Sequence, residues 1–175
     1  MTTSQHPPFE APVTGQMLGH FGLFGGLAPE TLDFLAETLR NKTIVPGDVV
    51  FREGDMAAEM FVVLSGEFEV LKRSKRGIEA RVAMLGVGDW FGEMSILDVQ
   101  PRSATVRALA PSRVLAITAV DLDAIYRRDM KAYSLLVLNV ARELSRRLRV
   151  ADGILAALVV SLLDDLVGKR HGTAT

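Results

Sequence analysis

The chain has 175 residues, a formal net charge of −1 at pH 7, 49% hydrophobic residues and 23% charged residues. This length allows one domain with a small appendage, and this composition excludes global disorder. The lack of cysteine excludes a disulfide scaffold, a thiolate nucleophile and a cysteine-ligated metal. The histidines (His6, His20 and His171) lie near the ends of the chain, which argues against a histidine-rich metal site. The near-zero net charge argues against a general polyanion binder.

The sequence predicts neither a membrane span nor a secretory signal. Its longest uninterrupted apolar run, Ile154–Val160, is much shorter than the ~20 residues that a membrane-spanning helix needs. The N-terminal residues lack a basic start followed by an apolar stretch. We therefore expect a cytoplasmic protein.

The N-terminal residues divide into a lead-in and a helical segment. Residues 1–16 are polar and rich in proline, which predicts a poorly ordered lead-in. In residues 17–42, Leu32, Leu35 and Leu39 recur at helical spacing, and Pro29 suits the first turn of a helix.

The middle of the chain changes to short apolar runs separated by glycine-containing turns. This density of short strands predicts an antiparallel β-roll, jelly-roll-like with about eight strands, and hence an α+β fold. The expected strands are Thr43–Phe51, Glu59–Leu64, Glu67–Arg73, Glu79–Leu85, Ser103–Leu109 and Ser112–Ile117.

The C-terminal residues return to a helical pattern. A short helix is expected over Val120–Arg128 and a long one from about Lys131 to Leu166, with a possible bend at Gly153. The long helix carries an unbroken seam at alternating spacings of four and three, made of Val137, Ala141, Leu144, Leu148, Ala151, Leu155, Leu158 and Leu162. The seam could pack on the roll or on a second copy of the chain. The distal part favours a homodimer, while a four-helix contact or a separate partner protein stays open.

These patterns predict three parts: a lead-in over residues 1–16, the roll with its N-terminal helices over 17–130, and a helical arm over 131–168.

The segment from Phe91 to Thr105 joins two strands of the roll and contains the residues best suited to bind a ligand. In it, Gly92 allows close approach of a ligand, and the next residues can form one helical turn whose N–H groups suit an anion. Arg102 offers a planar fork of donors for phosphate oxygens, and Glu93 offers an acceptor for a sugar hydroxyl.

This segment resembles the phosphate-binding cassette of the cyclic nucleotide-binding domain family, which includes the sensor domains of the catabolite activator and of the protein kinase A regulatory subunit. The resemblance covers residues 20–150. It rests on Phe91-Gly92-Glu93 and on Pro101-Arg102-Ser103-Ala104-Thr105. It also rests on upstream motifs in the family's order, namely Pro46-Gly47-Asp48, Gly54-Asp55, Phe61–Gly66 and Gly88-Asp89.

The resemblance implies a role for each matching residue. Glu93 is expected to accept from the ribose 2′-hydroxyl and Arg102 to pair with the cyclic phosphate, with backbone N–H groups near Ser95 and Ser103 assisting. The cassette residues expected to contact the ligand are Phe91, Gly92, Glu93, Met94, Ser95, Arg102, Ser103 and Ala104. Val70, Val82 and Ala83 are expected to line the purine pocket. On the long helix, Ala151 and Asp152 occupy the positions that reach the base in the catabolite activator, although alanine has no side-chain hydrogen-bonding group, and Arg147 is a further candidate contact to the nucleotide.

Several features also have simpler explanations. Glu93 and Arg102 taken alone could form a surface ion pair that closes a loop. Trp90 is expected in the core rather than on a base. The basic stretch from Lys72 to Arg76 is expected to be a solvated hairpin tip rather than a nucleic-acid contact.

The sequence therefore predicts a non-enzymatic receptor that needs no cofactor or metal and binds cyclic AMP or cyclic GMP. It is expected to dimerise through the arm, to signal by moving its C-terminal helix, and to act on an unknown effector protein. No direct DNA binding is expected, because too few residues follow the arm for a helix-turn-helix. The alternative is a protein-interaction module whose pocket is vestigial or takes another ligand, such as a cyclic dinucleotide.

Overall fold

The computed structural model describes residues 11–57 and 59–171, with residues 165–171 described by their backbone. The chain divides into two compact units, Met1–Val137 and Leu138–Thr175. The three-part division predicted from the sequence stays a prediction. Residues 1–10 of the expected lead-in lie outside the described residues.

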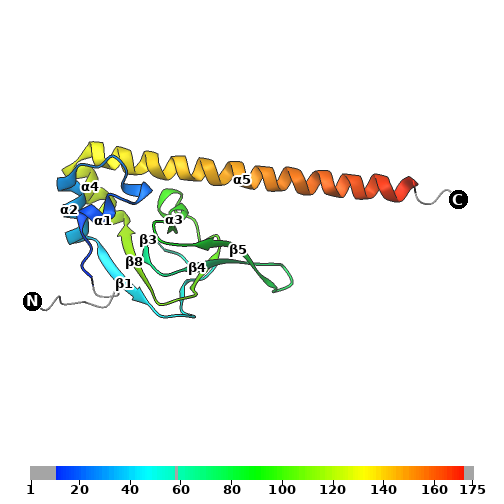
Figure 1. The fold of residues 1–175 in the computed structure, drawn as a ribbon, viewed down its shortest axis with the longest axis horizontal. Helices are drawn as coiled ribbons and strands as arrows, with labels where there is room; N and C mark the ends of the chain where they lie inside the picture. Colours follow the sequence, from blue (N-terminus) through cyan, green and yellow to red (C-terminus); the bar gives the residue numbers. More distant parts are fainter. Residues whose placement is uncertain (1–10, 58, 172–175) are drawn as a thin grey trace, which may run out of the picture. The chain divides into compact units, whose positions relative to one another are not determined.

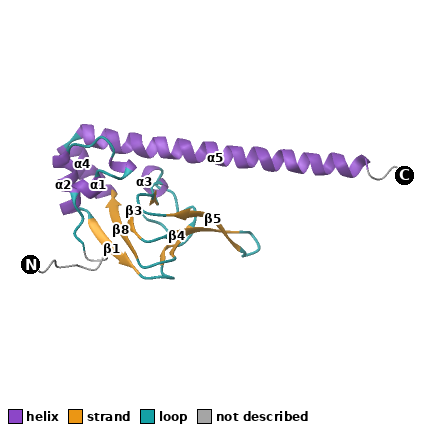
Figure 2. Cartoon of the chain, in the orientation of Figure 1, coloured by secondary structure: helices purple, strands orange, loops and turns teal. Residues whose placement is uncertain are grey.

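The first unit is built around two four-stranded antiparallel sheets (Figure 2). In the first sheet the strand order is β1-β8-β3-β6, with bounds Arg40–Ile44, Ser112–Thr118, Glu59–Ser65 and Trp90–Phe91. In the second it is β2-β7-β4-β5, with bounds Val49–Phe51, Thr105–Ala108, Phe68–Arg73 and Glu79–Leu85. The predicted α+β fold with an eight-stranded antiparallel roll is confirmed.

Two details of the strands differ from the sequence prediction. The single run expected over residues 43–51 is two strands, β1 and β2, which lie in different sheets. Gly47, with φ +88°, makes the turn between them, and this backbone conformation favours glycine. Strand β6 was not predicted, because its two residues are too few to show a period.

Aromatic and branched side chains from both sheets meet in one core. Phe61, Phe68 and Phe91 are buried there, and the ring of Phe91 lies 5.3 Å from that of Phe61 and 5.4 Å from that of Phe68. Trp90 is also buried, which confirms its expected place in the core. The two sheets therefore hold Phe91, the residue before Gly92, in a fixed position.

Helices gather at one end of the sheets (Figure 1). They are α1 (Gly15–Leu18), a 3₁₀ turn (Gly22–Phe24), α2 (Pro29–Thr38) and α4 (Ala119–Arg128). Pro29 occupies the first turn of α2, as expected. Thr118 caps α4 by accepting from the Asp121 amide, while the Asp121 carboxylate accepts from the Thr118 amide.

Helix α5 (Met130–His171) begins at a carboxylate cap. The Asp129 side chain accepts from the Ala132 amide at 3.0 Å and from the Thr31 hydroxyl at 3.1 Å. The hydrogen bond from Ala132 lowers the pKa of Asp129, because it favours the ionised carboxylate. Thr31 lies in α2, so this cap ties the beginning of α5 to the N-terminal helices.

The second unit is the continuation of α5 from Leu138. The helix runs through Gly153 without a break. Its apolar side chains lie in solvent: Leu148, Val150, Ile154, Leu155, Leu158, Val159, Val160, Leu162 and Leu163 are exposed. Among the described residues, no helix has the length and apolar character needed to cross a membrane.

Candidate functional site

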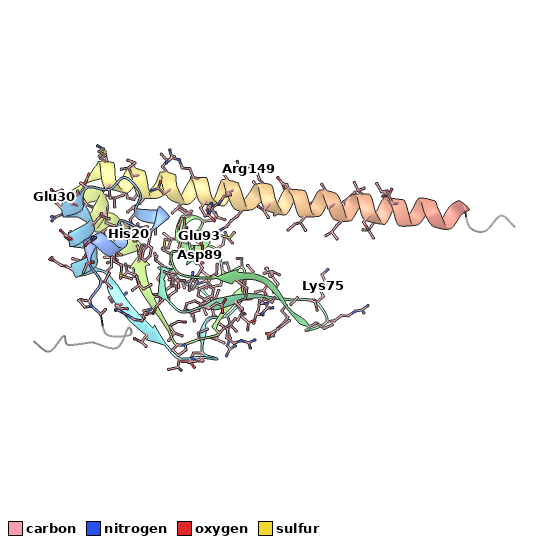
Figure 3. The ribbon with its side chains drawn as sticks, viewed as in Figure 1. His20, Glu30, Lys75, Asp89, Glu93 and Arg149 are labelled. Carbon is pink, nitrogen blue, oxygen red and sulfur yellow. The ribbon has the colours of Figure 1, made fainter. Side chains whose placement is uncertain are left out.

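The segment from Phe91 to Thr105 leaves the first sheet at β6 and joins the second at β7. Helix α3 (Met94–Leu97) forms the single helical turn expected between them. Figure 3 marks Glu93 at the start of this turn. Gly92 has φ +82°, so the turn begins at a backbone conformation that favours glycine.

The guanidinium of Arg102 lies inside the protein, and the residue is 3% exposed. Its Nη1 donates to the carbonyl oxygen of Gly92 at 2.9 Å and to the hydroxyl of Ser95 at 3.3 Å. Its Nη2 donates to the carbonyl oxygen of Glu59 in β3 at 2.6 Å. Arg102 therefore connects the beginning of the cassette with the first sheet.

These contacts leave one edge of the guanidinium unused. An arginine has five N–H donors, and the three contacts above occupy both donors of Nη1 and one of Nη2. Among the described residues, no acceptor pairs with the buried Nε of Arg102. In a guanidinium, Nε–H and the neighbouring N–H of Nη2 point in the same direction within the plane, and such a fork matches two oxygens of a phosphate.

The charge of Arg102 is balanced by carboxylates around it. Burial lowers the pKa of Arg102, because it disfavours the charged form, and the carboxylates of Glu59, Asp55 and Glu93 act in the opposite direction. The carboxylates offset the attraction of the buried cation for a further anion. The Nε–H without a partner is therefore the feature of this site that favours a phosphate.

The backbone of Arg102 is held by the loop between β2 and β3. The Gly54 amide donates to the Arg102 carbonyl at 2.9 Å, and the Arg102 amide donates to the Asp55 carbonyl at 2.8 Å. The Asp55 carboxylate accepts from the Arg52 amide at 2.8 Å, which shapes the loop. The sequence marked Gly54-Asp55 as part of the family's frame, and the structure shows that this pair braces Arg102.

Gly92 is needed for space as well as for conformation. A Cβ atom at this position would lie 2.5 Å from Nη1 of Arg102 and 3.2 Å from the Glu59 carbonyl oxygen. Any side chain here would push the guanidinium away from its acceptors. The glycine of the cassette and its arginine therefore depend on each other.

The remaining cassette residues divide into buried and exposed ones. Glu93 is 4% exposed and Ser95 is also buried, so the alternative of a surface ion pair between Glu93 and Arg102 does not describe this site. Met94 and Ser103 are exposed, and the Ser103 hydroxyl donates to the sulfur of Met94 at 3.7 Å. Ala104 is at the border of burial and begins the return to β7.

The loop between α3 and Arg102 contains a strained residue. Val99 has φ +47°, and among residues 11–57 and 59–171 it is the one non-glycine residue with a positive φ. A β-branched side chain is unfavourable in this region of backbone space. The contacts that fix α3 and Arg102 on either side of Val99 hold it there.

The residues expected to line the purine pocket lie on the hairpin of β4 and β5. Val70 in β4 pairs with Ala83 in β5 across the second sheet. Val70 is half-buried, whereas Ala83 is exposed and Val82 is 58% exposed. At the tip of this hairpin, residues 72–76 are exposed, and Figure 3 labels Lys75 there, which confirms the expected solvated tip.

The residues expected to approach from the long helix belong to the second unit. They are Arg147, Ala151 and Asp152, and Nε of Arg147 donates to the Glu143 carboxylate one turn earlier at 2.9 Å. Their contact with a nucleotide stays a prediction.

A cavity of about 460 Å³ lies behind the cassette helix. Ile96 and Leu97 line it from α3, Leu122 and Tyr126 from α4, and Tyr133 and Val137 from the beginning of α5. The rings of Tyr126 and Tyr133 meet edge to face at 5.4 Å. A movement of α3 would therefore change the packing of α4 and of the first turns of α5.

The fold and the cassette together define a known class of domain. The sequence model of the cyclic nucleotide-binding domain matches residues 41–129, just over half of the chain. The chain therefore belongs to the cyclic nucleotide-binding domain family, and the predicted resemblance is confirmed.

Individual relatives agree with this assignment. The cyclic AMP receptor protein of Thermus thermophilus is 37% identical over 130 residues, which are 74% of this chain and 58% of that protein. The cAMP-dependent protein kinase regulatory subunit of Blastocladiella emersonii is 35% identical over 86 residues, which are 49% of this chain and 21% of that protein. The solved structure of the Thermus thermophilus catabolite activator protein aligns with a TM-score of 0.70 at 36% identity, covering 78% of this chain and 62% of that chain. The chain thus matches less than two thirds of the first of these relatives.

Proposed function

We propose that this chain is a non-enzymatic receptor for cyclic AMP or cyclic GMP. The observation that carries the proposal is the buried guanidinium of Arg102, whose Nε has no protein acceptor among the described residues and whose Nη2 uses one of its two N–H groups on Glu59. The cyclic phosphate would occupy this fork, and the buried carboxylate of Glu93 would accept from the ribose 2′-hydroxyl. The named relatives are a cyclic AMP receptor and a kinase regulatory subunit, which supports a sensing role.

The proposed mechanism is a shift between two conformations of the cassette. Because Nε of Arg102 is buried, a phosphate can reach it only if the cassette segment moves. Movement of α3 would alter the cavity that it shares with α4 and α5, and so reposition the C-terminal helix. The nucleotide can shift this equilibrium only by its different affinity for the two conformations.

The proposal includes a homodimer formed through the arm, an effector protein and the cytoplasmic location expected from the sequence. The homodimer is supported by the row of exposed apolar side chains on α5, because a helix that exposes such a row is stabilised by burying it against another helix.

Titration calorimetry of the native chain with cyclic AMP and, separately, cyclic GMP tests the receptor proposal. We expect saturable binding of at least one of them with one site per chain, and a rise in melting temperature at saturation. Neither heat nor thermal shift with both nucleotides would refute it. A third titration with a cyclic dinucleotide tests the alternative ligand.

The second candidate is an interaction module whose pocket is vestigial. It is favoured by the same burial, because Glu93 and Arg102 are 4% and 3% exposed. Mass spectrometry of the native and of the denatured protein separates the two candidates. A nucleotide released on denaturation supports the receptor, whereas a stable oligomer that binds no nucleotide supports the interaction module.

A further inference from the structure

The guanidinium of Arg102 lies over the face of an aromatic ring. Its central carbon Cζ lies 4.0 Å from the centroid of the Phe51 ring and 6.0 Å from that of Phe61. Phe51 is the last residue of β2 in the second sheet, whereas the acceptors Glu59 and Gly92 flank strands of the first sheet. The guanidinium is therefore held between the two sheets.

The ring supplies a restraint that the hydrogen bonds do not. The bonds from Nη1 and Nη2 to Gly92 and Glu59 fix one edge of the guanidinium. The group can still rock about that edge, which would swing Nε out of line. A ring packed against the group opposes this rotation, and the contact is also favourable because the ring's negative face attracts a cation.

Phe51 is itself fixed by other rings. Its centroid lies 6.2 Å from that of Phe61 and 5.8 Å from that of Phe91, and Phe91 directly precedes Gly92. Phe61 already contacts a cation of its own, because Nζ of Lys42 lies 4.9 Å from the centroid of its ring. Phe51 is thus the ring placed to orient Arg102, and its own position is set by the core.

We infer that Phe51 is a positioning residue for the phosphate of the ligand. It keeps the guanidinium plane of Arg102 oriented so that the fork of Nε and Nη2 can receive two phosphate oxygens. This inference rests on the proposed function and adds to it a residue that lies far from the cassette in sequence. The simpler alternative is that Phe51 only fills space in the core.

Titration of cyclic AMP into matched variants separates these explanations. We expect Phe51→Leu to weaken binding about 3- to 30-fold, the range that cation–ring contacts span from exposed to desolvated sites, and Phe51→Tyr to restore it. The control Phe68→Leu removes a ring that packs on Phe91 in the same core, and binding should stay within twofold of native. In an Arg102→Lys background, where the cation has no plane to orient, Phe51→Leu should cost less than twofold.

A second measurement does not depend on the nucleotide. In a ¹H–¹⁵N spectrum, the buried Nε–H of Arg102 should give a slowly exchanging signal shifted by the ring current of Phe51. Phe51→Leu should move this signal toward the ordinary arginine position and speed its exchange, whereas Phe68→Leu and Phe51→Tyr should preserve it.

The outcomes distinguish the inference from the proposed function. Equal losses of affinity in the native and Arg102→Lys backgrounds, or an unchanged Nε–H signal in Phe51→Leu, would reduce Phe51 to a packing residue. If the native chain binds neither cyclic nucleotide, the proposed function fails, and the Nε–H signal alone decides whether Phe51 orients Arg102.

Discussion

The cassette buries charged side chains, whereas the arm exposes apolar ones. In the cassette, the charged Glu93 and Arg102 are buried, and Arg102 is bonded to groups of the same chain. In the arm, apolar residues such as Leu155 and Leu162 lie in solvent, being 62% and 63% exposed. The cassette therefore satisfies its charged groups within one chain, except for part of a guanidinium, whereas the arm leaves its apolar side chains exposed.

The difference also appears along the arm itself. Residues 142–149 contain five charged side chains, and Glu143 pairs with both Arg146 and Arg147. Residues 150–163 contain one, Asp152. Burying a leucine is worth about 1.5–3 kcal/mol, so the second half of the arm would gain free energy by packing against another helix. The charged residues of the first half could then determine the orientation and register of that packing.

The largest expected effect comes from substitutions that disrupt association through the arm and leave the cassette unchanged. In the double variant Leu155→Asp with Leu162→Asp, we expect the proposed dimer to dissociate at least ~100-fold more readily, because each lost leucine contact is worth about 2–5 kcal/mol. Analytical ultracentrifugation measures this. Val160→Asp is the matched control, since Val160 projects from the side of the helix opposite the predicted seam. If the control dissociates equally, a bundle of more helices is indicated.

The next effect breaks the cassette and leaves the arm intact. Arg102→Ala removes charge-assisted contacts to the phosphate, and at about 1.5–3 kcal/mol for each contact we expect cyclic nucleotide affinity to fall ~100-fold or more. Calorimetry measures the affinity, and Arg73→Ala on the exposed hairpin should bind as the native chain does. Unchanged affinity in Arg102→Ala would remove this residue from the site.

Gly92→Ala sharpens the dependence within the cassette. Because its Cβ would lie 2.5 Å from Nη1 of Arg102, we expect weaker nucleotide binding together with a loss of stability. The strained φ alone costs about 1–3 kcal/mol. Gly47→Ala is the control, since Gly47 has φ +88° but no atom within 4 Å of an added Cβ. Chemical denaturation and calorimetry of both variants separate the strain, which they share, from the displacement of Arg102.

The smallest effect concerns the strain at Val99. Val99→Gly removes an unfavourable positive φ, and after the entropy cost of glycine we expect a net gain of roughly 0.5–1 kcal/mol in the free energy of unfolding. Val87→Gly, in another exposed loop with ordinary backbone angles, should give no gain. A loss of stability in Val99→Gly would show that the valine side chain has a favourable contact that outweighs the strain.

The sequence was informative where local chemistry leaves a pattern. The short apolar runs separated by glycine-containing turns predicted the roll, and Phe91-Gly92-Glu93 with Pro101-Arg102 predicted the cassette. It misjudged the run over residues 43–51, because its apolar pattern continues through the turn at Gly47 that divides it between two sheets. It also missed β6, because two residues carry no periodicity.

Burial was the feature that the sequence could not predict for the site. Taken alone, Glu93 and Arg102 fit a surface ion pair, and only their register with Gly92, Ser95 and Ser103 favoured ligand binding, so the sequence did not predict how deeply the two charges are buried. Only the structure shows the carbonyl oxygens of Glu59 and Gly92 at Arg102, and backbone acceptors have no signature in the residue type.

By itself, the sequence determined the family, the fold and the identity of the cassette, because these depend on residue types at short spacings. The tertiary structure decided which donor of Arg102 has no protein acceptor among the described residues and which aromatic ring contacts its guanidinium. Phe51 and Arg102 are brought together by two sheets packing on one core, and that contact joins residues far apart in the chain. A long-range contact of this kind is set by how the core fills, and no local pattern in the sequence encodes it.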